Sequence, residues 1–126
     1  MQYFDGVDCP ADVNVPTEDG DAWLWYPEYK WVYNKLAISE SQGFACGPHG
    51  IEPPSFPVFS KPVFNMRGMG TGSRIMRNLT DYKTHQKPGH FWTTLLEGEH
   101  VSSDVAVVKG VAKWCRHTTG EPLKVG

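Results

Sequence analysis

A lysine and a glycine-rich loop are the residues of this chain whose types and spacing best fit a chemical role. Lys61 ends a short apolar run, and glycines Gly68, Gly70 and Gly72 follow it, next to Ser73. Glycine allows a positive φ and a close approach of the backbone to a ligand, and successive free N–H groups form a concave anion site. A lysine ammonium group is a point charge suited to phosphate. The combination predicts nucleotide binding, and a flexible hairpin connection is the competing interpretation of the loop.

Spacing predicts no other reactive constellation. The five histidines show neither HxH nor HxxxH spacing, so no metal site is predicted. The three cysteines form no CxxC pair and are expected to be free thiols in a reducing compartment. No Ser-His-Asp or Cys-His arrangement follows from the spacing either. We therefore predict no catalytic and no metal-ligating residue.

Composition restricts the class of protein. A chain of 126 residues with 40% hydrophobic residues can form one domain with a core. A formal net charge of −2 argues against a sequence-independent nucleic-acid binder. No window approaches about 18 apolar residues, and the first residues lack the basic and apolar regions of a signal peptide. The sequence thus predicts a cytoplasmic, soluble protein with neither a nucleic-acid nor a membrane partner.

The elements that must position Lys61 and the loop follow from local patterns. Residues 1–22 are acidic and are expected to form an irregular arm. Apolar residues at helical spacing predict a helix over roughly 27–42, and it carries Lys35. A turn-rich loop is expected over 44–55, strands over 56–60 and 73–77, and a short helix from Leu79, with Asn78 or Thr80 as its cap.

The last third is predicted to be a strand meander. Its strands are expected over 91–96, 101–108 and 111–117, with Lys109-Gly110 as a two-residue turn. The predicted fold class is α+β, a small and mainly antiparallel sheet with about two helices on one face. One subdomain is expected over 23–120, followed by a tail over 121–126.

Four segments in order carry a family resemblance. Residues 33–37 begin a helix that ends in Gln42-Gly43, residues 56–62 read FPVFSKP, residues 65–74 are glycine-rich, and residues 96–110 begin LEGEHV. Together they resemble the lysine helix, the lysine strand, the phosphate lid and the segment after the adenine hinge of the ATP-grasp superfamily, the fold of biotin carboxylase and D-alanine–D-alanine ligase. The resemblance covers about residues 33–117.

The resemblance implies a role for each matching position. Lys35 and Lys61 match the lysines that contact ATP phosphates. The lid and the hinge would add Gly68, Gly70, Gly72 and Ser73, and the backbone of Thr94, Leu95 and Leu96. Magnesium is expected with ATP, but the family's metal-binding carboxylates and asparagine lie beyond the hinge, and this chain stops at Gly126.

These implications favour a nucleotide-binding fragment related to ATP-dependent carboxylate–amine ligases and catalytically incomplete alone. A fragment that exposes apolar surface is expected to form a homo-oligomer or to bind a companion portion. The competing hypothesis is a stand-alone protein-interaction module that keeps the fold and binds no nucleotide.

Overall fold

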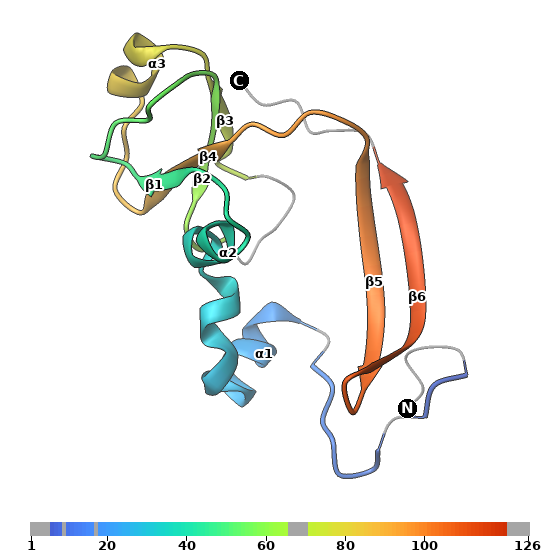
Figure 1. The fold of residues 1–126 in the computed structure, drawn as a ribbon. Coiled ribbons are helices and arrows are strands. Elements are labelled where there is room, and N and C mark those ends of the chain that lie inside the picture. Colours follow the sequence, from blue (N-terminus) through green and yellow to red (C-terminus); the bar gives the residue numbers. More distant parts are fainter. Residues whose placement is uncertain (1–5, 9, 17, 66–70, 121–126) are drawn as a thin grey trace. The chain divides into compact units, whose positions relative to one another are not determined.

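The computed structural model describes residues 6–8, 10–16, 18–65 and 71–120. Their elements run in the order α1 (Asp19–Trp25), the 3₁₀ helix η1 (Pro27–Tyr33), α2 (Lys35–Ser41), β1 (Cys46–Pro48), β2 (Val58–Pro62), β3 (Arg74–Met76), α3 (Leu79–Thr84), β4 (His90–Thr94), β5 (His100–Val108) and β6 (Val111–Gly120) (Figure 1). The α+β class with antiparallel sheets is confirmed, with four helices in the described residues where about two were expected.

The described residues fall into two units. One holds residues 18–96 and contains α1 to β4; the other holds the β5–β6 hairpin and the N-terminal segment. The subdomain predicted over 23–120 covers parts of both. Among the described residues, no helix is long and apolar enough to cross a membrane.

A four-stranded antiparallel sheet forms the centre of the first unit, with strand order β1-β4-β2-β3. Side chains alternate between the two faces of a strand, so residues paired across strands share a face. Val58 pairs with Met76, and Ser60 pairs with Trp92, which places all four on one face. Val58, Met76 and Trp92 form the buried core of this face with Tyr82 of α3.

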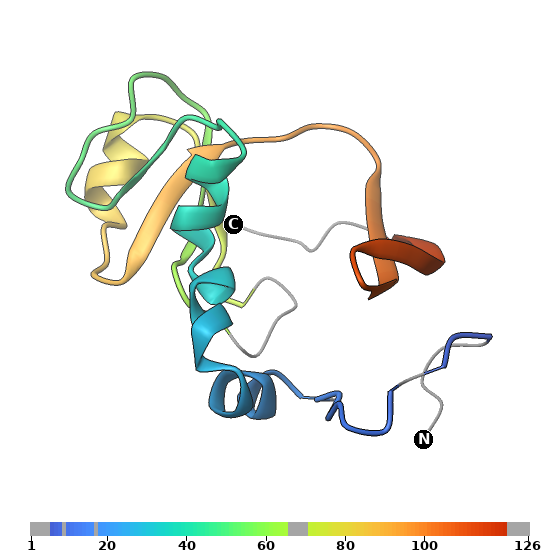
Figure 2. The same cartoon turned by 60° about the horizontal axis from the view of Figure 1, so that its bottom comes forward.

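The opposite face of the sheet carries Phe59, Lys61, Phe91 and Thr93, by the same register. Phe91 is fully buried there, and α2 packs beside β1 and β4. The helices α2 and α3 therefore cover opposite faces of the sheet (Figures 1 and 2). The expectation of helices on one face was wrong. We call the side with Lys61 the α2 face.

Asparagine caps explain where two of the helices begin. Asn34 has extended backbone angles (φ −80°, ψ 97°), and its Oδ1 accepts a hydrogen bond from the Ala37 N–H at 3.0 Å. The predicted helix over 27–42 is consequently divided into η1 and α2, because the cap residue leaves the helical conformation. Asn78, one of the two caps that the sequence left open, caps α3 in the same way and accepts from the Asp81 N–H at 2.9 Å.

Three other expectations require correction. The helix α1 begins at Asp19, inside the segment expected to be irregular, and β1 lies inside the predicted loop over 44–55. The strand β4 pairs with β1 and β2, so the last third is no continuous meander. The hairpin turn is confirmed: Lys109 and Gly110 both have positive φ, 51° and 78°, as a two-residue type I′ turn requires.

The β5–β6 hairpin is a two-stranded sheet (Figure 1). The side chains of its described residues are nearly all exposed. Among its described residues only Ala106 is buried. A bulge interrupts the register between Ala106 and Val107.

Candidate functional site

Lys35 and Lys61 lie on the same side of the sheet. The Lys35 backbone N–H donates to the Val63 carbonyl at 2.9 Å, which joins the first residue of α2 to the chain just after β2. Burial lowers the pKa of Lys61 below its ordinary value, and the positive charge of Lys35 lowers it further. The structure thus brings together the two lysines that the sequence singled out.

The Lys61 side chain is half-buried, and two aromatic rings lie near its ammonium group. Its Nζ lies 5.7 Å from the ring centroid of Phe91 and 5.9 Å from that of Phe59. The ion pairs of the described residues are His85–Asp81 and Arg116–Asp104, so no carboxylate of that part of the chain neutralises Lys61. A buried cation without an opposite charge is costly, and the two ring faces offset only part of that cost.

A buried hydroxyl on the α2 face also lacks a partner. Thr93 is 6% exposed, and its Oγ1 makes no hydrogen bond with any described residue. Thr93 pairs with Phe59 and therefore shares a face with Lys61. Buried polar groups in native proteins normally have partners, so this hydroxyl is a donor on the Lys61 face that a ligand could use.

The glycine-rich loop is described only at its ends. Gly68 and Gly70 lie outside the described residues. Gly72 has φ +78°, and a Cβ added there would lie 3.1 Å from the Cγ of Pro62. Glycine at this position therefore serves both the turn and its close approach to the end of β2. Ser73 is half-buried directly before β3.

The predicted hinge residues Thr94, Leu95 and Leu96 differ from one another in burial and hydrogen bonding. The Thr94 N–H donates to the Ala45 carbonyl at 3.1 Å, and its Oγ1 donates to the same oxygen at 3.4 Å. That N–H is therefore engaged in the sheet and is not available to a base edge. Leu95 is half-buried, whereas Leu96 is 66% exposed.

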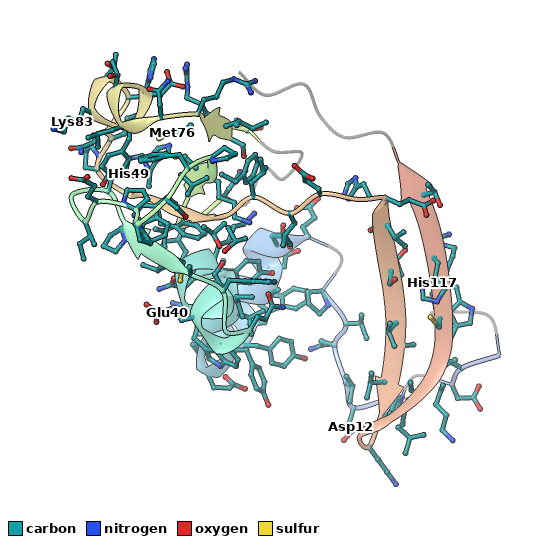
Figure 3. The ribbon with its side chains drawn as sticks, turned by 45° about the horizontal axis from the view of Figure 1, so that its top comes forward. Asp12, Glu40, His49, Met76, Lys83 and His117 are labelled. Atoms are coloured by element: carbon teal, nitrogen blue, oxygen red, sulfur yellow. The ribbon has the colours of Figure 1, made fainter. Side chains whose placement is uncertain are left out.

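A serine–histidine contact is present that sequence spacing did not reveal. The Nε2 of His49, which is labelled in Figure 3, lies 2.9 Å from the Oγ of the buried Ser60. The Lys87 backbone N–H donates to Nδ1 of the same ring at 2.9 Å. A backbone N–H can only donate, so Nδ1 must be the unprotonated nitrogen and Nε2 carries the proton. His49 consequently donates to Ser60 and cannot accept the serine proton.

Burial, followed by the nearby His90 and Lys87, lowers the pKa of His49. A histidine that stays neutral and donates to a buried serine fastens the loop before β2 to the sheet. We assign this contact to stability and not to nucleophilic catalysis. Only the fold joins residues this far apart in the sequence, so no local signal could have predicted it.

Comparisons with known proteins assign this chain to no family. No family model, curated protein or solved structure matches this chain. The resemblance to the ATP-grasp superfamily stays a prediction. No group of three or more His, Cys, Asp or Glu side chains within the described residues could hold a metal ion.

Proposed function

We propose that the α2 face binds the phosphate groups of a nucleotide, with ATP as the candidate ligand, through Lys35 and Lys61. The observation that carries the proposal is the half-buried Lys61, which Lys35 repels and which no carboxylate of the described residues neutralises. A polyanion placed between the two ammonium groups would replace their repulsion with two attractions. Charge-assisted hydrogen bonds of this kind contribute about 1.5–3 kcal/mol each.

The remainder of the face supports the same ligand class. The Thr93 hydroxyl offers a donor that no described residue uses. Gly72 lies against Pro62, the residue that follows Lys61 in β2. A phosphate chain on the α2 face would have two cations and a hydroxyl within one side of the sheet. The proposal covers binding and assigns no chemical step.

Calorimetric titration of the full chain with ATP and Mg²⁺ tests the proposal. Lys61→Met keeps the length and apolar stem of the side chain and removes its charge, and we expect it to weaken binding at least tenfold. Lys83→Met is the matched control, because Lys83 lies in α3, on the other face of the sheet, and is exposed. Equal affinity of wild type and Lys61→Met, or equal loss in both variants, would overturn it.

The chemistry of the ligand is resolved by a second titration with tripolyphosphate and with adenosine. Binding of tripolyphosphate but not adenosine is expected if phosphate recognition dominates, as the engaged Thr94 N–H and the exposed Leu96 favour. Binding of adenosine alone would contradict the role of the lysines.

One observation favours the interaction module as a second candidate function. A two-stranded sheet by itself is marginally stable in water, and the described part of the hairpin buries only Ala106. Its strands of nine and ten residues leave two sheet edges that another strand could extend. On this proposal a second copy of the chain pairs along such an edge. Light scattering that gives the mass of a monomer at high protein concentration would reject it.

A further inference from the structure

A cysteine, a histidine and a serine form a hydrogen-bonded chain on one face of the β5–β6 hairpin. The Sγ of Cys115 lies 3.2 Å from Nε2 of His117, and the Oγ of Ser103 lies 2.6 Å from Nδ1 of the same ring. His117 is labelled on the hairpin in Figure 3. Ser103 pairs directly with His117 across the strands, and Cys115 precedes His117 by two residues. Strand alternation therefore places all three side chains on one face.

The three side chains are accessible from solvent. Cys115 is a free cysteine and is exposed, and Ser103 and His117 are exposed as well. Cys115 also pairs with Val105, whereas the Asp104–Arg116 ion pair belongs to the opposite face. Within the described strands, the paired positions of the Cys115 face carry no carboxylate that would oppose a thiolate. Lys113 lies two residues before Cys115, at the bulge.

The imidazole of His117 is free to accept a proton, unlike that of His49. The Nδ1 of His117 contacts a hydroxyl, which can either donate or accept, so both tautomers of the ring are satisfied. When Nδ1 donates to Ser103, Nε2 is an acceptor facing the Cys115 thiol. After the thiol proton has moved to Nε2, the imidazolium still donates one hydrogen bond to Ser103 and one to the thiolate.

We propose that Cys115 is a reactive thiol, with His117 as its proton acceptor, and that it forms mixed disulfides with low-molecular-weight disulfides such as oxidised glutathione. The thiol proton passes to His117 Nε2, and the thiolate attacks one sulfur of the reagent. A new S–S bond forms as the reagent's own S–S bond breaks. The leaving thiolate takes the proton from the imidazolium, so one disulfide replaces another and no further oxidant is required.

Cys46 provides an internal comparison. It lies in β1, is half-buried, and its pKa is raised by burial and then by the negative charge of Glu40. Because the thiolate is the reacting species, Cys46 is expected to react slowly. Comparing the reaction rates of Cys115 and Cys46 therefore tests whether Cys115 is activated.

The experiment uses two variants of the full chain that retain one cysteine each. Cys9→Ser with Cys46→Ser leaves Cys115, and Cys9→Ser with Cys115→Ser leaves Cys46. The reaction of each with the aromatic disulfide DTNB is followed at pH 7 by the absorbance of the released thiolate. Oxidised glutathione follows as the physiological class of reagent, with the adduct located by mass spectrometry. We expect Cys115 to react at least tenfold faster than Cys46.

Substitution of the acceptor then tests the mechanism. His117→Gln, in the Cys115-only chain, retains an amide that can donate to sulfur but cannot take its proton, and we expect the rate at pH 7 to fall about tenfold. Ser103→Ala should lower the rate less, because water can replace the hydroxyl. Arg116→Gln, on the opposite face, is the control and should leave the rate unchanged.

A measurement at about pH 10 distinguishes proton transfer from disturbance of the hairpin, because an ordinary thiol is ionised there without assistance. We expect His117→Gln to recover the rate of the Cys115-only parent chain at that pH. A deficit that persists at high pH would show that the substitution had altered access, and the proposal would be overturned. Reaction of Cys115 no faster than Cys46 at pH 7 would overturn it as well.

Discussion

The hydroxyl of Tyr82 offers the sharpest test of how the loop before β2 is held. Tyr82 is 1% exposed in α3, and its hydroxyl donates to the Ile51 carbonyl at 2.7 Å. The Tyr82 hydroxyl oxygen in turn accepts a hydrogen bond from the Gly50 N–H at 2.9 Å. One hydroxyl therefore fastens two consecutive residues of a segment that contains no strand or helix. Tyr82→Phe removes the hydroxyl and keeps the buried ring.

The expected cost follows from these contacts. The Ile51 carbonyl keeps a second donor, because Nε1 of Trp92 lies 2.8 Å from it. The Gly50 N–H loses its acceptor, but Gly50 is exposed and water can replace the phenol. The substitution therefore removes two hydrogen bonds without leaving a fully buried group unsatisfied, which corresponds to about 1–2 kcal/mol of unfolding free energy. For a unit of this size the melting temperature should fall by roughly 4–8 °C per kcal/mol.

Thermal and urea unfolding of the full chain, followed by tryptophan fluorescence, would measure the change. Tyr29→Phe is the matched control, because Tyr29 lies in η1 and is 59% exposed. We expect no measurable effect of the control and faster amide exchange at Gly50 in Tyr82→Phe. A stability equal to that of wild type would refute the view that this hydroxyl fastens the loop.

Three further predictions concern the Asn34 cap and the half-buried side chains of His49 and Lys61. Asn34→Ala should lower the unfolding free energy by about 1 kcal/mol in urea titration through loss of the α2 cap, and an unchanged midpoint would argue against that cap. The lowered pKa of His49 means that the folded state binds its proton less readily than the unfolded state, so stability should fall as pH drops below about 6.5, the ordinary pKa of histidine. His49→Gln should flatten this pH dependence of the unfolding free energy. An unaltered pH profile in the variant would contradict the prediction. The lowered pKa of Lys61 means that the protonated side chain costs stability at neutral pH and that this cost disappears as pH rises toward 10.5. Lys61→Met should therefore raise the unfolding free energy in the absence of nucleotide, and a lower value would show that the contacts with Phe59 and Phe91 outweigh burial.

Local signals in the sequence predicted most of the elements in residues 56–120. Asn78 before a short apolar turn marked the beginning of α3, and Lys109-Gly110 marked the hairpin turn, because both motifs act within a few residues. Local signals were misleading at Asn34, which was included in the predicted helix over 27–42 although its side chain caps α2. Apolar periodicity continued across this residue and concealed the break.

Strand pairing could not be read from the sequence. β1 has three residues, Cys46–Pro48, two of them glycine and proline, and exists because β4 pairs with it. Strands adjacent in sequence usually pair, which predicted a meander, but β4 pairs between β1 and β2. The proximity of Lys35 to Lys61 was predicted from the family resemblance. The unsatisfied hydroxyl of Thr93 and the hydrogen bonds that link Cys115, His117 and Ser103 depend on strand register, so only the structure revealed them.

The division of the described residues into two units has a consequence for how the molecule responds to heat. The sheet core around Trp92 and Tyr82 can melt cooperatively, while the β5–β6 ladder, in which Ala106 is the one buried residue among those described, frays from its open ends at lower free energy. Amide protons of β5 and β6 should then exchange with deuterium well before those of β2 and β4. A mixed disulfide at Cys115 would accordingly change the amide exchange of the hairpin that carries it.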